Sequence, residues 1–193
     1  MEIIIASHNQ HKVEEIRSII GADRLILRSL NDVGYHDEIV EDGATLQANA
    51  WIKANAIHGL YGGNVMSDDT GLEVDALDGA PGVISARFAG PQRDHEDNMD
   101  KLLSMLSQHD NRKAQFRTIV ALHWQRQRHE FEGIIRGKIS FSRSGSGGFG
   151  YDPIFVPDGY DKSFGELSPH TKNRISHRAL AFDQVKKFIL SQL

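Results

Sequence analysis

The order of hydrophobic patterns along the chain constrains its fold most, because the pattern changes its period near the middle. In the first half, residues 2–6 read as a buried strand, and residues 10–20 and 45–60 have helical spacing. Two long strand-like runs, AQFRTIVALHW and RHEFEGIIRGKIS, then follow with only a polar turn between them. That arrangement predicts an antiparallel hairpin rather than another βαβ unit. The sequence therefore predicts a mixed α/β fold with a partly antiparallel sheet.

The remaining elements are predicted from shorter patterns. NVMS and GLEVDAL read as two strands that flank an acidic turn, and IFVP reads as another strand. Apolar residues at helical spacing predict a helix over residues 95–108 and a last helix from about residue 172 to 192.

Composition limits the classes of function. The chain has 193 residues, no cysteine and a formal net charge of -4. Thiolate metal sites and thiol nucleophiles are excluded, and the absence of a lysine or arginine block argues against a nucleic-acid partner. No apolar run approaches the roughly 20 residues of a membrane helix, and the chain opens on a strand-like EIIIA, so we expect a soluble, cytoplasmic protein.

The glycine-rich stretch SGSGGFGYDP, residues 144–153, fits the spacing GxGxxG. A dinucleotide-binding turn needs a helix directly after it, whereas here Pro153 and the strand-like IFVP follow. The alternatives are a flexible hairpin tip and a ligand-binding turn. The aromatic residues Phe149 and Tyr151, next to Gly150 and Asp152, favour a platform for a planar ring.

A second motif, ASHNQHK, joins the first strand to the first helix. Ser7 or Asn9 can cap that helix, whose N-terminal N–H groups can bind an anion. Lys12 opposes the helix dipole unless an anion binds there, and a solvated surface lysine is the alternative. His8 and His11 have the spacing of a metal pair but lack a third soft ligand nearby.

Carboxylates form a third group of candidates. Asp68 and Asp69 precede Thr70 in SDDTG, and Glu41 comes shortly before the second helix. They could cap a turn or stabilise a helix N-terminus, but carboxylates are also the ligands that Mg²⁺ prefers.

Basic residues complete the set. Lys53 lies inside the second helix among small and apolar residues, either reaching water or pointing into a cleft. In KNRISHRAL, Lys172 and Ser176 share a face and His177 and Arg178 turn away from it, which indicates either a ligand rich in acceptors or a solvated basic turn. Taken together, the motifs indicate a nucleotide ligand.

Four of these motifs occur in the order found in one family: SHNQHK, SDDTGLEVDALDGAPGVISARFAG, GGFGYDPIF and ISHRA. The chain resembles the inosine/xanthosine triphosphate pyrophosphatases, also called Ham1-like or noncanonical purine NTPases, from residue 2 to about residue 182. The resemblance implies hydrolysis of ITP, dITP and XTP to the monophosphate and pyrophosphate with Mg²⁺. It also implies one domain over residues 1–193, a two-lobed α/β subunit with the active-site cleft between the lobes, and a homodimer.

The resemblance also implies roles for individual residues. Asp69 would be the general base and a metal ligand, and Glu41 a second metal ligand. Substrate would be bound by the loop and by the later motifs: Ser7, His8, Asn9, Gln10, His11, Lys12, Lys53, Thr70, Phe149, Gly150, Tyr151, Asp152, Lys172, His177 and Arg178. Within that set, Lys172, His177 and Arg178 would read the purine edge.

The chain departs from the family pattern at two positions. His8 replaces a common glycine, which affects the expected phosphate contacts, and Ala48 replaces the glutamate of GxTFxENA. If that glutamate helps to hold metal or water, Asp68, Glu41 or bound water must substitute. Two other functions remain as alternatives: a pyrophosphatase for pyrimidine nucleotides such as dTTP, as in the Maf-like proteins, and a nucleotide sensor without turnover.

Overall fold

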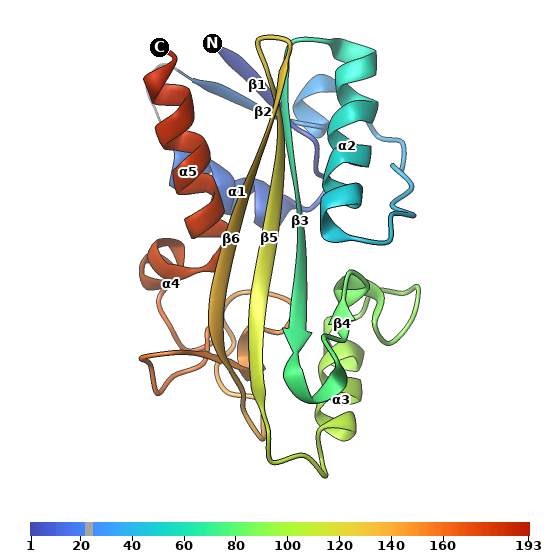
Figure 1. The fold of residues 1–193 in the computed structure, drawn as a ribbon, viewed down its shortest axis with the longest axis vertical. Helices are drawn as coiled ribbons and strands as arrows, with labels where there is room; N and C mark the ends of the chain where they lie inside the picture. The colour runs from blue at the N-terminus through green and yellow to red at the C-terminus, as the bar shows by residue number, and fades with distance from the viewer. Residues whose placement is uncertain (22–24) are drawn as a thin grey trace. The chain divides into compact units, whose positions relative to one another are not determined.

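The computed structural model describes residues 1–21 and 25–193 (Figure 1). Its helices are α1 (Gln10–Ile20), α2 (Leu46–Tyr61), α3 (His95–Met105), α4 (Pro169–Ile175) and α5 (His177–Ser191). Its strands are β1 (Glu2–Ile5), β2 (Ile26–Ser29), β3 (Asn64–Val74), β4 (Pro81–Gly82), β5 (Lys113–Trp124), β6 (Gln127–Ile139) and β7 (Phe155–Pro157). Among these described residues no helix is long and apolar enough to cross a membrane.

In the described part of the chain, seven strands hydrogen-bond into one mixed sheet with the order β2-β1-β3-β5-β6-β7, and β4 pairs with β3. Strand β1 is parallel to both β2 and β3, whereas β7 is antiparallel to β6. Only Gln125 and Arg126 separate β5 from β6, and both have positive φ, at 47° and 69°. A two-residue connection of this kind makes the antiparallel hairpin that the sequence predicts. The mixed α/β class is therefore confirmed.

The chain divides into two compact units. The first comprises Met1–Asp69, Thr118–Gly133 and Arg178–Leu193, and the second comprises Thr70–Arg117 and Ile134–His177. Each of the three longest strands, β3, β5 and β6, contributes residues to both units.

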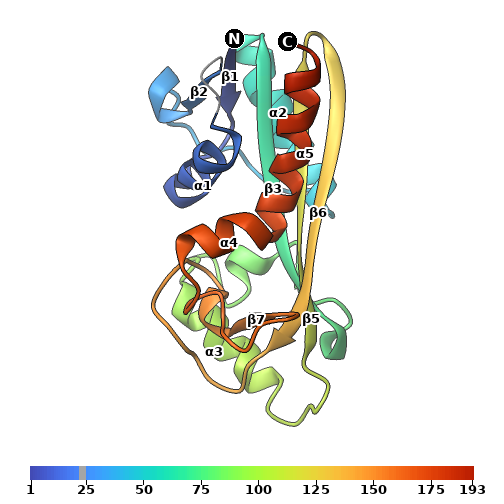
Figure 2. The same cartoon turned by 90° about the vertical axis from the view of Figure 1, so that its left-hand side faces the viewer.

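Strand alternation gives the first unit two separate cores. Ile3 and Met66 belong to a core that α1 and α5 complete, whereas Ile4 and Val65 belong to a core that includes Ile57 of α2. Successive side chains of a strand point to opposite faces, so neighbouring residues of β1 and β3 face different helices. In Figure 2, α1 and α5 lie in front of β3, on the face away from α2.

An aromatic core holds the second unit together. The rings of Phe116 and Phe155 lie 4.7 Å apart between centroids, and those of Phe155 and Phe164 lie 5.3 Å apart. Leu102 of α3 and Leu72 of β3 are fully buried in the same core. Tyr151 of the glycine-rich stretch belongs to this core, and Ile175 of α4 packs against it.

Two sequence predictions about the elements are wrong. The acidic turn does not exist, because Asp68 and Asp69 lie inside one continuous strand, β3, in which each carboxylate finds cationic partners. The last helix is interrupted at Ser176, whose backbone is extended with φ -66° and ψ 157°. The strands β2 and β4 were not predicted, since β4 has two residues and the four residues of β2 show little apolar alternation.

Candidate active site

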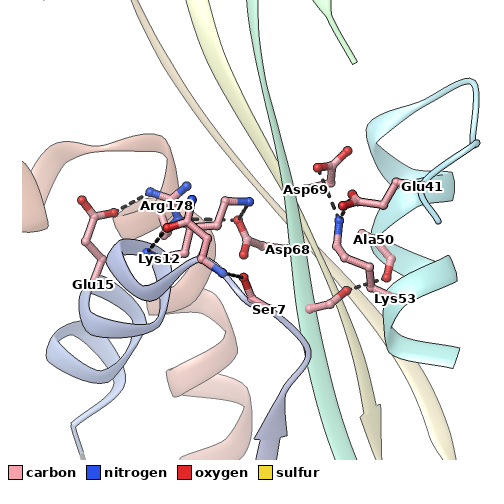
Figure 3. A network of polar contacts seen from close by, with 11 residues as sticks. Ser7, Lys12, Glu15, Glu41, Ala50, Lys53, Asp68, Asp69 and Arg178 are labelled. Atoms are coloured by element: carbon pink, nitrogen blue, oxygen red, sulfur yellow. Dashed lines mark hydrogen bonds and ion pairs between the residues drawn. The ribbon is translucent and has the colours of Figure 1, made fainter. Parts of the chain in front are cut away.

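The first unit carries two adjacent carboxylates that face opposite sides of β3 (Figure 3). Asp68 shares the face of Met66, toward α1 and α5, and Asp69 shares the face of Val65, toward α2. The alternation of a strand is the cause, since residues one apart point in opposite directions. The two carboxylates therefore have different partners and different chemistry.

Asp68 is the anchor of a buried ion-pair network. Its side chain is 0% exposed, and its Oδ2 lies 3.0 Å from Lys12 Nζ and 3.5 Å from Arg178 Nε. Burial by itself would raise the pKa of Asp68, but the charges of Lys12 and Arg178 outweigh it and hold the pKa well below the ordinary value. Asp68 is consequently ionised at neutral pH and positions two cations.

Arg178 is the third residue of this network. Its guanidinium donates from Nη1 to Glu15 of α1, and its side chain is 1% exposed. The break at Ser176 lies between Lys172 and Arg178, which belong to the second and the first unit respectively. The structure thus groups Arg178 with Lys12, whereas Lys172 and His177 lie in the other unit.

The loop before α1 is organised as the sequence predicts. Asn9 is the N-cap, and its Oδ1 accepts from the backbone N–H of Lys12 at 3.2 Å. Ser7 Oγ accepts from the backbone N–H of Asn9 at 3.2 Å. The first turn of α1 contains no acidic residue, so its N-terminal N–H groups suit an anion.

The other polar residues of this loop have local contacts or are exposed. His8 Nε2 lies 2.9 Å from the carbonyl oxygen of Asp37, and its ring stacks on Tyr35. Gln10 donates to Glu14, and His11 is exposed. No group of three or more His, Asp or Glu side chains suited to a metal occurs within residues 1–21 and 25–193, so the His8–His11 spacing is not extended to a histidine site.

On the opposite face of β3, Asp69 shares a lysine with Glu41. Lys53 Nζ donates to Glu41 Oε2 and lies 3.5 Å from Asp69 Oδ1. Asp69 Oδ2 is buried and has no hydrogen-bond partner among the described residues. Burial raises the pKa of Asp69, and the charges of Lys53 and Lys12 offset only part of that effect. The two aspartates therefore differ in basicity, because the pKa of Asp69 is raised and that of Asp68 is lowered.

The chemistry of these donors fits a hard divalent cation. Mg²⁺ is usually held by one or two carboxylates and completed by water and substrate phosphates, so a larger protein cluster is not required. Glu41 and Asp69 supply two carboxylates that already share one cation, and the buried Asp69 Oδ2 offers an unused ligand position. These two residues are the candidate metal ligands.

Asn49 and Ser67 support this site and were not predicted from the sequence. Asn49 Oδ1 accepts from the backbone N–H of Gly43 at 2.8 Å, two residues after Glu41. A Cβ on residue 43 would lie 2.6 Å from that oxygen and 2.7 Å from the Cβ of Ala48, so only glycine fits there. Ser67 donates to the carbonyl oxygen of Ala50, which ties α2 to β3. The sequence signal that could have identified Asn49 is a polar residue among the small and apolar residues of α2.

The second unit contains a compact cluster of Phe149, Asp152 and Lys172. Asp152 Oδ2 accepts from the backbone N–H of Phe149 and from Lys172 Nζ, both at 2.7 Å. The Lys172 ammonium also lies 4.9 Å from the centroid of the Phe149 ring. Both charged side chains are about 95% buried or more, and the half-buried Phe149 lies beside them. The arrangement combines an aromatic face with a fixed donor.

Glycines of the 144–153 stretch are required by contacts inside the unit. A Cβ on Gly148, whose φ is +75°, would lie 2.0 Å from Asp152 Oδ2. A Cβ on Gly145 would lie 2.2 Å from the backbone of Gly165. Of the glycines in the GxGxxG pattern, Gly145 is therefore required by close packing, whereas Gly150 is not. A three-residue 3-10 helix and β7 follow the stretch in place of a long helix, which supports the sequence argument against a dinucleotide fingerprint.

Tyr151 and His177, two residues that were predicted to contact the base, make contacts with other residues of the second unit. The buried Tyr151 hydroxyl donates to the carbonyl oxygen of Ser85 at 2.9 Å, and burial raises its pKa. The His177 ring stacks on Phe116, with centroids 4.5 Å apart. Gly150 has positive φ with open space around it, and Thr70 is half-buried at the first position of the unit.

Comparisons with known proteins agree with the resemblance in the motifs. The model of the Ham1 family matches residues 3–188. A dITP/XTP pyrophosphatase from Porphyromonas gingivalis is 48% identical over 190 residues, which is 98% of this chain and 97% of that protein. One with the same name from Bacillus subtilis is 40% identical and covers 97% of this chain and 96% of its own length.

Solved structures give the same result for the fold. The Staphylococcus aureus Ham1 protein matches with a TM-score of 0.90 at 34% identity, over 100% of both chains. A Coxiella burnetii HAM1 protein matches with a TM-score of 0.91 at 32% identity, again over 100% of both chains. The motifs, the fold and the full-length matches together show that this chain belongs to the Ham1 family.

Proposed function

We propose that this protein is a nucleoside triphosphate pyrophosphatase that hydrolyses the noncanonical purine nucleotides ITP, dITP and XTP to the monophosphate and pyrophosphate. Such an activity removes these nucleotides from the pool. The relatives named dITP/XTP pyrophosphatase match over nearly the whole chain. The observation in the structure that carries the proposal is Asp69, whose side chain is 13% exposed and which shares Lys53 with Glu41.

The first unit would bind the phosphates. Lys12 lies in the first turn of α1, where the helix N-terminus and its own charge both attract an anion. Ser7 and Asn9 present polar side chains at the same helix start. Lys12 and Lys53 would stabilise the negative charge that grows on the leaving pyrophosphate.

Glu41 and Asp69 would hold Mg²⁺, which when bound withdraws charge from the phosphate oxygens. Asp69 would also orient a water for in-line attack on the α-phosphorus and accept its proton. A carboxylate whose pKa is raised by burial is a better base than an ordinary one, which suits this role.

The second unit would bind the base. Phe149 offers a ring for stacking, and the Lys172 ammonium, fixed by Asp152, offers a donor for the O6 of a 6-keto purine. Adenine presents an amino group at that position, so donors in a buried site would be left without an acceptor. A cytoplasmic location, a homodimer and the absence of a nucleic-acid partner belong to the proposal as predictions from the sequence.

Replacing Phe149 by alanine should raise KM for dITP by about 10- to 100-fold, because stacking of a base on an aromatic ring contributes about 1–3 kcal/mol. The dependence of the rate on Mg²⁺ concentration should stay the same, since the candidate metal ligands belong to the first unit. Phe141→Ala is the control, because Phe141 lies in the same unit and is 82% exposed. An unchanged KM for Phe149→Ala would show that the stretch is only a structural turn.

The position of the cleaved bond tests the reaction itself. Hydrolysis of dITP in ¹⁸O-labelled water, followed by mass spectrometry, should place the label in the monophosphate, as attack on the α-phosphorus requires. Label in pyrophosphate would mean attack on the β-phosphorus, and release of dIDP with inorganic phosphate would identify a different hydrolase.

A further inference from the structure

Lys53 occupies the position that a metal ion would share with the two candidate ligands. The structure places its ammonium on Glu41 Oε2 and 3.5 Å from Asp69 Oδ1, and its side chain is 9% exposed. A buried ammonium needs an anionic partner, and here Glu41 and Asp69 each supply a carboxylate. The lysine is therefore held at the carboxylates by the same force that would attract a divalent cation.

The loop that carries Glu41 is fixed independently of Lys53. Asn49 lies four residues before Lys53 on α2, and its Oδ1 accepts from the Gly43 backbone N–H at 2.8 Å. Residues four apart in a helix lie on the same face, so Asn49 and Lys53 contact the loop at two neighbouring points. If Lys53 leaves, Asn49 still keeps Glu41 near Asp69.

We propose that Lys53 is an internal counter-ion that competes with divalent metal for Glu41 and Asp69 until nucleotide binds. Without nucleotide, the metal must displace a paired ammonium and then stay close to its charge, so metal alone binds weakly. Substrate phosphates provide Lys53 with another anion, and the two carboxylates become available. The inference rests on the proposed function, because it assigns an order of binding at the proposed site.

The first test measures the affinity of Mn²⁺ alone, from the loss of the free-ion electron paramagnetic resonance signal. Lys53→Met keeps the length of the side chain and removes its charge, so it should bind Mn²⁺ about tenfold more tightly than the unchanged protein. Lys53→Gln, which is also uncharged, should do the same, and Lys53→Arg should not. Lys187→Met removes an exposed charge from the same unit and should change the affinity less than twofold.

The second test repeats the titration with saturating α,β-imido-dITP, a nucleotide that resists cleavage. Binding of Mn²⁺ by the nucleotide itself is common to all variants, so the ratio of affinities between Lys53→Met and the unchanged protein is informative. That ratio should fall from about ten to about one, since Lys53 has moved to the phosphates. A ratio that is the same with and without nucleotide would overturn the exchange of partners.

These outcomes separate the inference from the proposed function. If Lys53→Met and Lys53→Gln bind Mn²⁺ alone no more tightly than the unchanged protein does, the competition is wrong. The proposed function would still stand if the unchanged protein releases pyrophosphate from dITP. If dITP is not hydrolysed, the function fails whatever the metal titrations give.

Discussion

Asp69→Asn is expected to lower kcat for dITP by about 10³-fold without loss of stability. Asparagine keeps the shape of the side chain and an oxygen for Lys53, but it cannot accept a proton and is a poorer metal ligand. In the part of the chain that the structure describes, Asp69 Oδ2 has no hydrogen-bond partner, and burial disfavours the charged form of this carboxyl. Folding therefore loses little when the charge is removed.

Pyrophosphate release and urea unfolding of the same samples check this prediction. Asp183→Asn provides the matched control, because Asp183 lies in the same unit, is 53% exposed and pairs only with the exposed Lys187 among the ion pairs of the described residues. It should leave both quantities unchanged. An Asp69→Asn enzyme with a normal rate would remove Asp69 from the reaction and would favour a binding protein.

Asp68→Asn is expected to change stability instead, and to destabilise the first unit by about 3 kcal/mol. It removes the anion that lies 3.0 Å from Lys12 and 3.5 Å from Arg178, and so leaves cations without their buried partner. The pKa of Asp68 is lowered in the folded state, so this contribution is present above about pH 4 and is lost as the pH falls toward the folded-state value.

Tryptophan fluorescence during urea unfolding at pH 7 measures the free energy of unfolding of the first unit. The chain has two tryptophans, Trp51 and Trp124, and both lie in the first unit with Asp68. Asp183→Asn should again shift the free energy of unfolding by less than about 0.5 kcal/mol. If Asp68→Asn unfolds at the urea concentration of the unchanged protein, the network is not holding the unit together.

The elements of the first unit were largely predictable because local patterns determine them. Asn9 before an apolar helical repeat gave the start of α1, and glycine after the repeat gave the end of α2. The length of β3 was not predictable in this way, because two adjacent aspartates are typical of a turn. They are tolerated in a strand only because Lys12, Arg178 and Lys53 neutralise them from both faces.

The sequence predicted which residues are candidates for the site, but not which of their side chains contact one another. Glu41 and Asp69 were predicted as metal ligands and Lys53 separately as a phosphate-binding residue, and the structure adds that Lys53 pairs with both carboxylates. The resemblance grouped Arg178 with Lys172 and His177 at the purine edge, and one continuous helix was predicted there. Hydrophobic periodicity does not show the interruption of the helix at Ser176. Arg178 pairs with Glu15 and Asp68 of the first unit.

The most direct test of the proposed function is the ratio of kcat/KM for dITP to that for dATP, with Mg²⁺ and with pyrophosphate as the product measured. The two substrates differ only at C6 and in the proton on N1, and the C6 group is the one that the second unit is proposed to read. We predict a ratio on the order of 10² to 10⁴ in favour of dITP, and a lower value for dTTP than for dITP. Equal values for dITP and dATP, faster hydrolysis of dTTP, or binding of dITP with no Mg²⁺-dependent hydrolysis would contradict the account.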